Sequence, residues 1–318
     1  MNNAVYTKFV IGSSRLIKRD ISASIRQRLF DLSKRENRPF GEVLQYYAIE
    51  RFLFRLSKSK YADRFILKGA LLLSVWHSEV LRSTMDIDLL GRLENSEETI
   101  TAAIQAILEQ NVIDDGIVYH ASTITTEAIS EDARYRGIRV SFEATLAVAK
   151  IRLKIDIGFG DSMYPAPQSQ EFPVLLDQEA PHLLCYSREN AIAEKFEAMV
   201  KLGNLNSRMK DFFDIWLLSR YFSFDQAILA KALKLTFTQR ETKMDTSVVF
   251  SPEFSSLKQV QWEAFRKRQK LSYSPAQFSE VVNSLSRFLL PCVSSEMADV
   301  GEAMIWKPRG PWERKVKE

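Results

Sequence analysis

The chain has 318 residues, of which 46% are hydrophobic and 26% are charged, as in an ordinary folded protein. Its net charge of +4 permits local basic patches but is too small for a protein that coats DNA. Two distant cysteines exclude a disulfide framework, and no apolar run approaches the ~20 residues that span a membrane, so we expect a cytoplasmic protein. Glycine-rich phosphate-binding patterns are missing, and the three histidines show no zinc-ligand spacing.

Residues 20–60 show the apolar spacing of two helices. Apolar side chains recur at helical intervals at Ile25, Leu29 and Leu32. Pro39 then interrupts the pattern, because the residue before a proline resists the helical conformation. We therefore predict two N-terminal helices that meet near this proline.

Residues 61–165 alternate between runs typical of strands and runs typical of helices. The predicted elements are a strand at 65–67, a turn and short helix at 68–76, a strand at 85–90, a helix at 96–110, and strands at 137–147 and 150–159. The last two strands are close enough in sequence to form an antiparallel hairpin. Strands punctuated by helices, with an antiparallel pair late in the region, predict an α+β fold with a small mixed sheet.

The remainder of the chain is predicted to be a linker followed by helices. Four prolines between residues 163 and 181 indicate a linker or a wrapping loop. Beyond it, the predicted elements are helices at 189–202, ending before Gly203, at 208–222 and from Ser274-Pro275 onward, and an extended tail from 307. The predicted organisation is therefore N-terminal helices at 1–60, a core at 61–165, and a linker with a C-terminal helical domain at 166–318.

Two acids one residue apart make residues 82–88 the most informative segment. If the segment is a strand, Asp86 and Asp88 lie on the same face about 6.6 Å apart. Two carboxylates at that distance repel each other unless a cation lies between them, and Mg²⁺ prefers carboxylate oxygens. The alternative is two surface aspartates on an exposed edge strand. The apolar neighbours Ile87 and Leu89 favour the metal-binding interpretation.

Asp156 is the candidate for a third carboxylate. It lies on the predicted strand 150–159, and by alternation it shares a face with Lys154. If this strand pairs with the strand that carries Asp86 and Asp88, three carboxylates converge, as in two-metal phosphoryl or nucleotidyl transfer. The alternative is an acid near the strand end that only supports a turn.

Several polar residues near these acids could bind phosphate. The turn at Lys68 and Gly69 precedes a short helix, where backbone N–H groups can approach an anion. Arg82 and Thr84 alternate with Asp86 and could contact phosphate on the same face. An ordinary strand-to-helix turn and ordinary surface polar groups are the alternatives.

A second charged cluster lies in the helical half. Lys195 is on one predicted helix, and Arg208, Lys210, Asp211 and Asp214 begin the next. A solvated network of ion pairs is the default interpretation of such charges. The functional interpretation is a cationic wall that faces the carboxylates and holds a nucleoside triphosphate or an acceptor RNA.

Five blocks of sequence combine these candidates in a fixed order: 65–70, 82–88, 154–158, 193–198 and 207–214. In this order they resemble the AbiEii/AbiGii toxins of type IV toxin–antitoxin and abortive-infection systems, which are related to the MenT toxins. The resemblance covers roughly residues 20 to 220. It implies a DNA polymerase β-like nucleotidyltransferase core flanked by N-terminal helices and a C-terminal helical domain.

The resemblance also implies a site. Asp86, Asp88 and Asp156 would bind Mg²⁺ or Mn²⁺, and Lys195 and Asp211 match active-site positions of the family. The residues expected to bind the nucleoside triphosphate are Lys68, Gly69, Arg82, Thr84, Lys195, Arg208 and Lys210.

The expected activity is the transfer of a nucleoside monophosphate from a nucleoside triphosphate to an acceptor, with the 3′ end of tRNA as the expected acceptor. The expected partner is a winged-helix antitoxin encoded by the adjacent gene, and no membrane partner is expected. The expected biological role is phage defence. Relatives often carry a hydroxyl residue in the turn where this chain has Ala70-Leu71. The alternative is therefore a nucleotide-binding effector that transfers nothing and acts through a protein partner.

Overall fold

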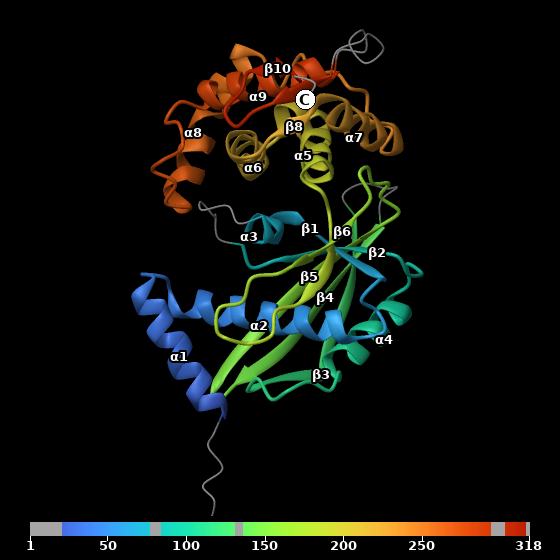
Figure 1. The fold of residues 1–318 in the computed structure, drawn as a ribbon, viewed down its shortest axis with the longest axis vertical. Coiled ribbons are helices and arrows are strands. Elements are labelled where there is room, and N and C mark those ends of the chain that lie inside the picture. Colours follow the sequence, from blue (N-terminus) through green and yellow to red (C-terminus); the bar gives the residue numbers. More distant parts are fainter. Residues whose placement is uncertain (1–20, 77–83, 131–135, 294–302, 316–318) are drawn as a thin grey trace, which may run out of the picture.

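The computed structural model describes residues 21–76, 84–130, 136–293 and 303–315, which form two lobes (Figure 1). One lobe holds a seven-stranded sheet, and the other is mainly helical. The elements of the sheet lobe are α1 (Ile21–Arg35), α2 (Phe40–Lys58), β1 (Phe65–Lys68), η1 (Gly69–Leu71), α3 (Leu72–Val75), β2 (Ile87–Gly91), α4 (Glu97–Leu108), β3 (Ile117–Ser130), β4 (Arg136–Leu146), β5 (Ala149–Phe159), β6 (Gln168–Glu171) and β7 (His182–Cys185).

The helical lobe follows β7 directly. Its elements are α5 (Arg188–Leu202), η2 (Gly203–Leu205), α6 (Met209–Tyr221), β8 (Phe224–Asp225), α7 (Gln226–Gln239), α8 (Pro252–Arg268), α9 (Phe278–Val293), β9 (Met304–Trp306) and β10 (Trp312–Arg314). Three of these strands form a small sheet in the order β10-β9-β8. Gly203 ends α5 with φ of 46°, as the sequence predicts.

The seven-stranded sheet is mixed, which confirms the predicted fold class at that level. Its strand order is β3-β4-β5-β2-β1-β7-β6. β2 runs parallel to β5 and β1 parallel to β7, whereas the other neighbours are antiparallel. The central position of β2, between β5 and β1, places its polar residues in the middle of the sheet.

Alternation along β5 separates an apolar face from a polar face. Ile151, Leu153, Ile155 and Ile157 are all buried, whereas the residues between them are exposed or half-buried. The helices of the sheet lobe cover the apolar face, for example through the ring contact of α2 with β4 at Phe52 and Phe142, whose centroids are 5.6 Å apart. The polar face is thereby left for charged side chains.

The structure corrects the sequence analysis in three places. β3 is absent from the prediction, because polar and apolar residues are mixed along it without a sustained alternation and its pairing with β4 holds it extended. The predicted loop at 163–181 contains β6, and the region predicted to be helical begins with β7, so the sheet continues past residue 165. The last long helix begins at Phe278 rather than at Pro275, and the proline in a first helical turn is Pro252, behind the N-cap Ser251.

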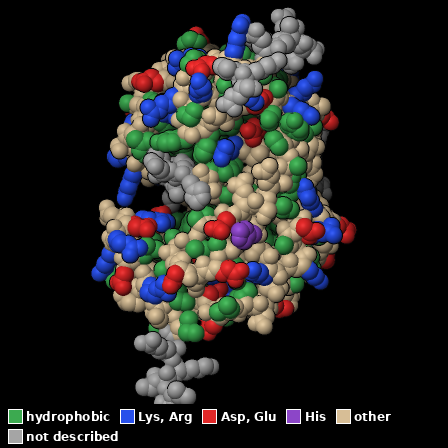
Figure 2. All heavy atoms as spheres, viewed as in Figure 1, with side chains coloured by type: hydrophobic (Ala, Val, Ile, Leu, Met, Phe, Trp, Pro, Cys, Tyr) green, Lys and Arg blue, Asp and Glu red, His purple; other side chains and the backbone are tan. Residues whose placement is uncertain are grey.

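The surface shown in Figure 2 carries basic and acidic side chains interspersed over both lobes. On this face the net charge of +4 is therefore not gathered into one basic field. Among the helices of the described segments, none is both long and apolar enough to cross a lipid bilayer.

Candidate active site

Strand register places four charged residues in one row across the sheet. Lys68 of β1 pairs with Asp88 of β2, Asp88 pairs with Asp156 of β5, and Asp156 pairs with Arg139 of β4. Neighbouring strands lie about 4.8 Å apart, so Asp88 and Asp156 are adjacent. The pairing of β2 with β5, on which the predicted cluster of acids depends, is therefore confirmed.

A pocket of about 520 Å³ lies between this row and the first helices of the helical lobe. Sheet-lobe and helical-lobe side chains both contribute to its wall. The predicted site residues that line it are Lys68, Gly69, Thr84, Asp86, Asp88, Asp156, Lys195, Arg208, Lys210 and Asp211. Arg82, the remaining predicted site residue, lies outside the described residues.

Gly69 allows Asp88 to lie against the turn that follows β1. Its φ is +72°, a left-handed conformation that favours glycine. A Cβ atom at this position would lie 1.9 Å from Oδ2 of Asp88, far inside any normal contact distance. The glycine predicted to admit a phosphate thus also makes room for a carboxylate.

The electrostatic environment of Asp88 is mixed. Burial raises the pKa of its carboxyl, and the nearby charge of Asp156 raises it further. Lys68, Lys195 and Lys210 act in the opposite direction, although the net pKa shift remains upward. A carboxylate in this position is stabilised by additional positive charge.

The other two acids of the predicted metal site are paired with cations from the polar face of the sheet. Oδ1 of Asp86 lies 2.9 Å from Nζ of Lys154. Arg139 donates two hydrogen bonds to Asp156, from Nε at 2.7 Å and from Nη2 at 2.9 Å. The hydrogen bonds to Asp156 raise the pKa of the Arg139 guanidinium above its usual value.

Asp88 and Asp156 lie on adjacent strands and Asp86 lies just before β2, and carboxylates are the donor type that Mg²⁺ or Mn²⁺ prefers. Within the described segments, however, no three acidic, histidine or cysteine side chains are grouped as they would be around a metal ion. The residue types fit a divalent cation by their chemistry, but Asp86 and Asp156 would have to leave Lys154 and Arg139 to share one with Asp88.

Lys195 of α5 is held by two buried acids of α6. Its Nζ lies 2.8 Å from Asp214 and 3.3 Å from Asp211, and both aspartate side chains are fully buried. Arg208 approaches Asp211 as well, with Nε 2.6 Å from Oδ2. The acids fix the lysine and the arginine at the pocket wall, and exposed Lys210 adds a further cation there.

Lys68 belongs to a network of ion pairs that the sequence analysis did not predict. Its Nζ lies 2.9 Å from Asp161, which follows β5, and 3.2 Å from Glu194 of α5. Arg240, which follows α7, lies 3.2 Å from the same Asp161 and 3.4 Å from the same Glu194. Tyr186 donates to Glu194 at 3.0 Å.

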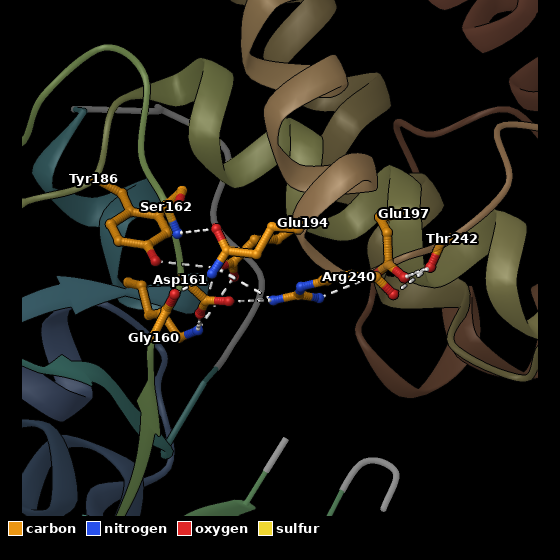
Figure 3. A network of polar contacts seen from close by, with 10 residues as sticks. Gly160, Asp161, Ser162, Tyr186, Glu194, Glu197, Arg240 and Thr242 are labelled. Carbon is orange, nitrogen blue, oxygen red and sulfur yellow. Dashed lines mark hydrogen bonds and ion pairs between the residues drawn. The ribbon is translucent and has the colours of Figure 1, made fainter. Parts of the chain in front are cut away.

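The network extends into the helical lobe through Glu197. Arg240 lies 2.9 Å from this carboxylate, which also accepts a hydrogen bond from Thr242 (Figure 3). The network therefore joins the end of a sheet strand to two helices of the other lobe. Asp161 could have been suspected from its place just after the strand that carries Asp156, but no local pattern indicates Arg240.

Opposing charges set the pKa values of this network. Burial acts against the charged form of Lys68, but Glu194 and Asp161 outweigh it and raise the pKa of the lysine. Burial likewise acts to raise the pKa of Asp161, yet Lys68 and Arg240 hold it at about 2. Lys68 is thus a fixed cation beneath the pocket, already engaged by two acids.

The comparisons with known proteins point to one family. The model of the family described as "Nucleotidyl transferase AbiEii toxin, Type IV TA system" matches residues 51–284, from within α2 to within α9. No curated protein matches the chain.

Solved structures from Helicobacter pylori are similar to the chain at low identity. A candidate nucleotidyltransferase is 12% identical, with a TM-score of 0.44, over 77% of this chain and 93% of its own. JHP933 is 15% identical, with a TM-score of 0.42, over 78% of this chain and 93% of its own. The family match covers most of the chain, and the chain therefore belongs to the AbiEii nucleotidyl transferase toxin family of type IV toxin–antitoxin systems.

Proposed function

We propose that this toxin is a metal-dependent nucleotidyltransferase with a DNA polymerase β-like core, which transfers a nucleoside monophosphate from a nucleoside triphosphate to the 3′ end of an RNA, with tRNA as the expected acceptor. The observation that carries the proposal is that one pocket is lined both by the predicted acids of the sheet lobe and by the predicted cations of the helical lobe. Asp88 of β2 and Asp156 of β5, with Asp86 just before β2, line the sheet side of the pocket. Lys195 of α5, with Arg208 and Lys210 at the start of α6, lines the helical side.

The cationic side suits a triphosphate. Lys195 and Arg208 are oriented by buried carboxylates, so little side-chain freedom is lost when they bind phosphate oxygens. Lys210 and the hydroxyl of Thr84 provide further contacts at the same wall. We propose that Arg82, which precedes Thr84 in the sequence, also binds phosphate.

The acidic side suits the reacting centre. Asp86 and Asp88 would hold a divalent cation, and a cation bound there would neutralise phosphate oxygens as charge moves to the leaving pyrophosphate. Asp156 is next to Asp88 across the sheet, where it would complete the metal site or accept the proton of the acceptor hydroxyl. Asp211 keeps Lys195 in place.

Membership in a type IV family implies an antitoxin that opposes the toxin. We propose that this antitoxin is a winged-helix protein from the adjacent gene and that the pair acts in the cytoplasm as an abortive-infection defence against phage.

The activity is tested by incubating the purified protein with each of four α-labelled nucleoside triphosphates, total tRNA and Mg²⁺. We expect label on RNA with one or more triphosphates, and we expect EDTA to abolish the labelling and excess Mg²⁺ or Mn²⁺ to restore it. Triphosphate binding by calorimetry without label on RNA or protein would instead support the effector without transfer activity. Labelling that is unaffected by EDTA would contradict the metal site.

Replacing Gly69 with alanine should impair both folding and transfer. The left-handed backbone costs an alanine roughly 1–2 kcal/mol, and the new methyl group displaces the Asp88 carboxylate. A misplaced catalytic group can lower the rate about 10²-fold. Urea unfolding and the labelling assay measure the two effects.

Gly160 provides a matched control for Gly69. Its φ is +81°, but an added Cβ would meet nothing within 4 Å. Gly160→Ala should therefore lose similar stability and retain transfer. If Gly69→Ala transfers as well as Gly160→Ala, the contact with Asp88 does not matter.

A further inference from the structure

A second pocket of about 700 Å³ adjoins the active site and shares Met85 and Asp86 with it. It lies beside the first turns of α2, on the polar side of β3, β4 and β5. The residues that line only this second pocket are Gly41, Glu42, Gln45, Glu127, Arg139, Ser141, Arg152 and Lys154. Anything bound there is within reach of the acids of the first pocket.

Three cations line the second pocket, Arg152 and Lys154 of β5 and Arg139 of β4, and Lys150 continues the line along β5 outside it. We call these four residues the basic stripe. The three β5 residues alternate along the strand and therefore share a face, about 6.6 Å apart from one to the next. Asp156 is the next residue of that face, beside Arg139. The stripe thus runs along one strand directly into the active site.

Two cations of the stripe neutralise the acids that the proposed chemistry needs. Lys154 pairs with Asp86 at 2.9 Å, and Arg139 pairs with Asp156 at 2.7 Å. These cations remain accessible, because the Lys154 side chain is 39% exposed and that of Arg139 32% exposed. The exposed pair of Lys154 with Asp86 is weak. The pair of Arg139 with Asp156 has two hydrogen bonds and is stronger, but its partly exposed guanidinium still lets a polyanion compete for it.

Acids neutralise part of the stripe, because Lys154 and Arg139 are paired and Glu143 of β4 is opposite Arg152 in strand register. Glu127 accepts from Arg139 at 3.2 Å, and Glu42 lies 3.5 Å from Arg38 of the α1–α2 connection. Arg152 is exposed and forms no ion pair with another described residue. The line of cations, with one such arginine at its centre, suits a phosphodiester backbone better than a compact acidic protein surface.

We propose that the basic stripe binds the backbone of the acceptor RNA as a single strand, and that this binding draws Lys154 and Arg139 away from Asp86 and Asp156. The two carboxylates then become available to a divalent cation only when the acceptor is in place. This inference rests on the proposed nucleotidyl transfer and adds to it the path of the acceptor and a reason for ordered activation.

The stripe is tested with the double variant Lys150→Gln/Arg152→Gln, which leaves the acids and their partners unchanged. Fluorescence anisotropy with a labelled single-stranded RNA should show binding weakened about tenfold or more. The slope of log affinity against log salt should fall by about 1.4, since each lost contact with a single strand contributes about 0.7.

Arg64 and Arg92 provide a matched control, because they are exposed beyond the ends of β1 and β2 that lie away from Asp88. Arg64→Gln/Arg92→Gln loses the same charge and should bind RNA as the wild type does. Equal weakening in both double variants would show that only net charge matters and would overturn the proposal. So would unchanged RNA binding in the stripe variant together with loss of binding to the cognate antitoxin.

The release of the carboxylates is tested by Mn²⁺ binding, measured by the paramagnetic resonance signal of free Mn²⁺. In the wild type, RNA should raise the affinity for Mn²⁺ about tenfold. Lys154→Gln should bind Mn²⁺ at the raised affinity without RNA, because Asp86 is then unpaired. An Mn²⁺ affinity that responds neither to RNA nor to Lys154→Gln would overturn the coupling.

These measurements separate the inference from the proposed function. Transfer to an acceptor other than RNA, without RNA binding at the stripe, would overturn the inference and leave nucleotidyl transfer intact. RNA binding that is coupled to Mn²⁺ binding, without any transfer, would support the inference and overturn nucleotidyl transfer.

Discussion

Replacing Asp88 with asparagine is expected to lower nucleotidyl transfer by roughly 10³-fold or more, the largest effect that any single substitution should have on activity. Asp88 lies at the centre of the charged row, between Lys68 and Asp156. Burial raises the pKa of its carboxyl, so positive charge brought close to it is strongly favoured. An amide of the same shape offers no negative charge and leaves packing nearly unchanged.

The labelling assay measures this loss, with thermal unfolding to show that the variant folds. Asp63→Asn is the matched control, because Asp63 precedes β1 and its side chain is 73% exposed. The control should transfer at the wild-type rate. Transfer by Asp88→Asn within tenfold of the wild type would exclude Asp88 as a metal ligand.

Replacing Arg240 with methionine is expected to lower the free energy of unfolding by roughly 3–5 kcal/mol, the largest effect on stability. The guanidinium lies within ion-pair distance of Asp161, Glu194 and Glu197, and its side chain is 12% exposed. Methionine fills a similar volume but leaves three buried carboxylates with too little positive charge. The variant should also lose activity, because the same network supports the pocket.

Urea unfolding with a fluorescence readout measures this effect. Arg28→Met is the control, since Arg28 pairs with Asp177 at the surface, where the two side chains are 47% and 81% exposed. Such an exposed pair contributes little to stability. If the two substitutions cost the same, the buried network does not hold the lobes together.

Local patterns in the sequence were sufficient for the chemical character of the site. Strand alternation placed Asp156 on the same face as Lys154. The predicted strand at 85–90 is too early, because β2 begins at Ile87, but Asp86 still lines the same pocket as Asp88. Helix signals located α5 and α6, and with them Lys195 and Asp211. These are short-range properties, because side-chain periodicity depends only on the local backbone.

The same local rules failed where pairing with distant strands decides the conformation. β3 is a strand of mixed polarity that pairs with β4, and β7 is a short strand that pairs with β1 and β6. Neither carries an apolar pattern strong enough to be predicted alone. The boundary proposed at residue 165 separates strands that the sheet unites, for the same reason.

The sequence by itself determined which residue types this protein brings to its chemistry, and the order of its blocks determined the family. Only the tertiary structure decided which side chains form ion pairs: Arg139 with Asp156, Lys154 with Asp86, and Arg240 with the Asp161 that Lys68 also contacts. Side chains far apart in the chain meet through strand register and lobe packing, which no local pattern encodes. For that reason the sequence predicted three carboxylates, and the structure showed that two of them are held by cations at the entrance to a second pocket.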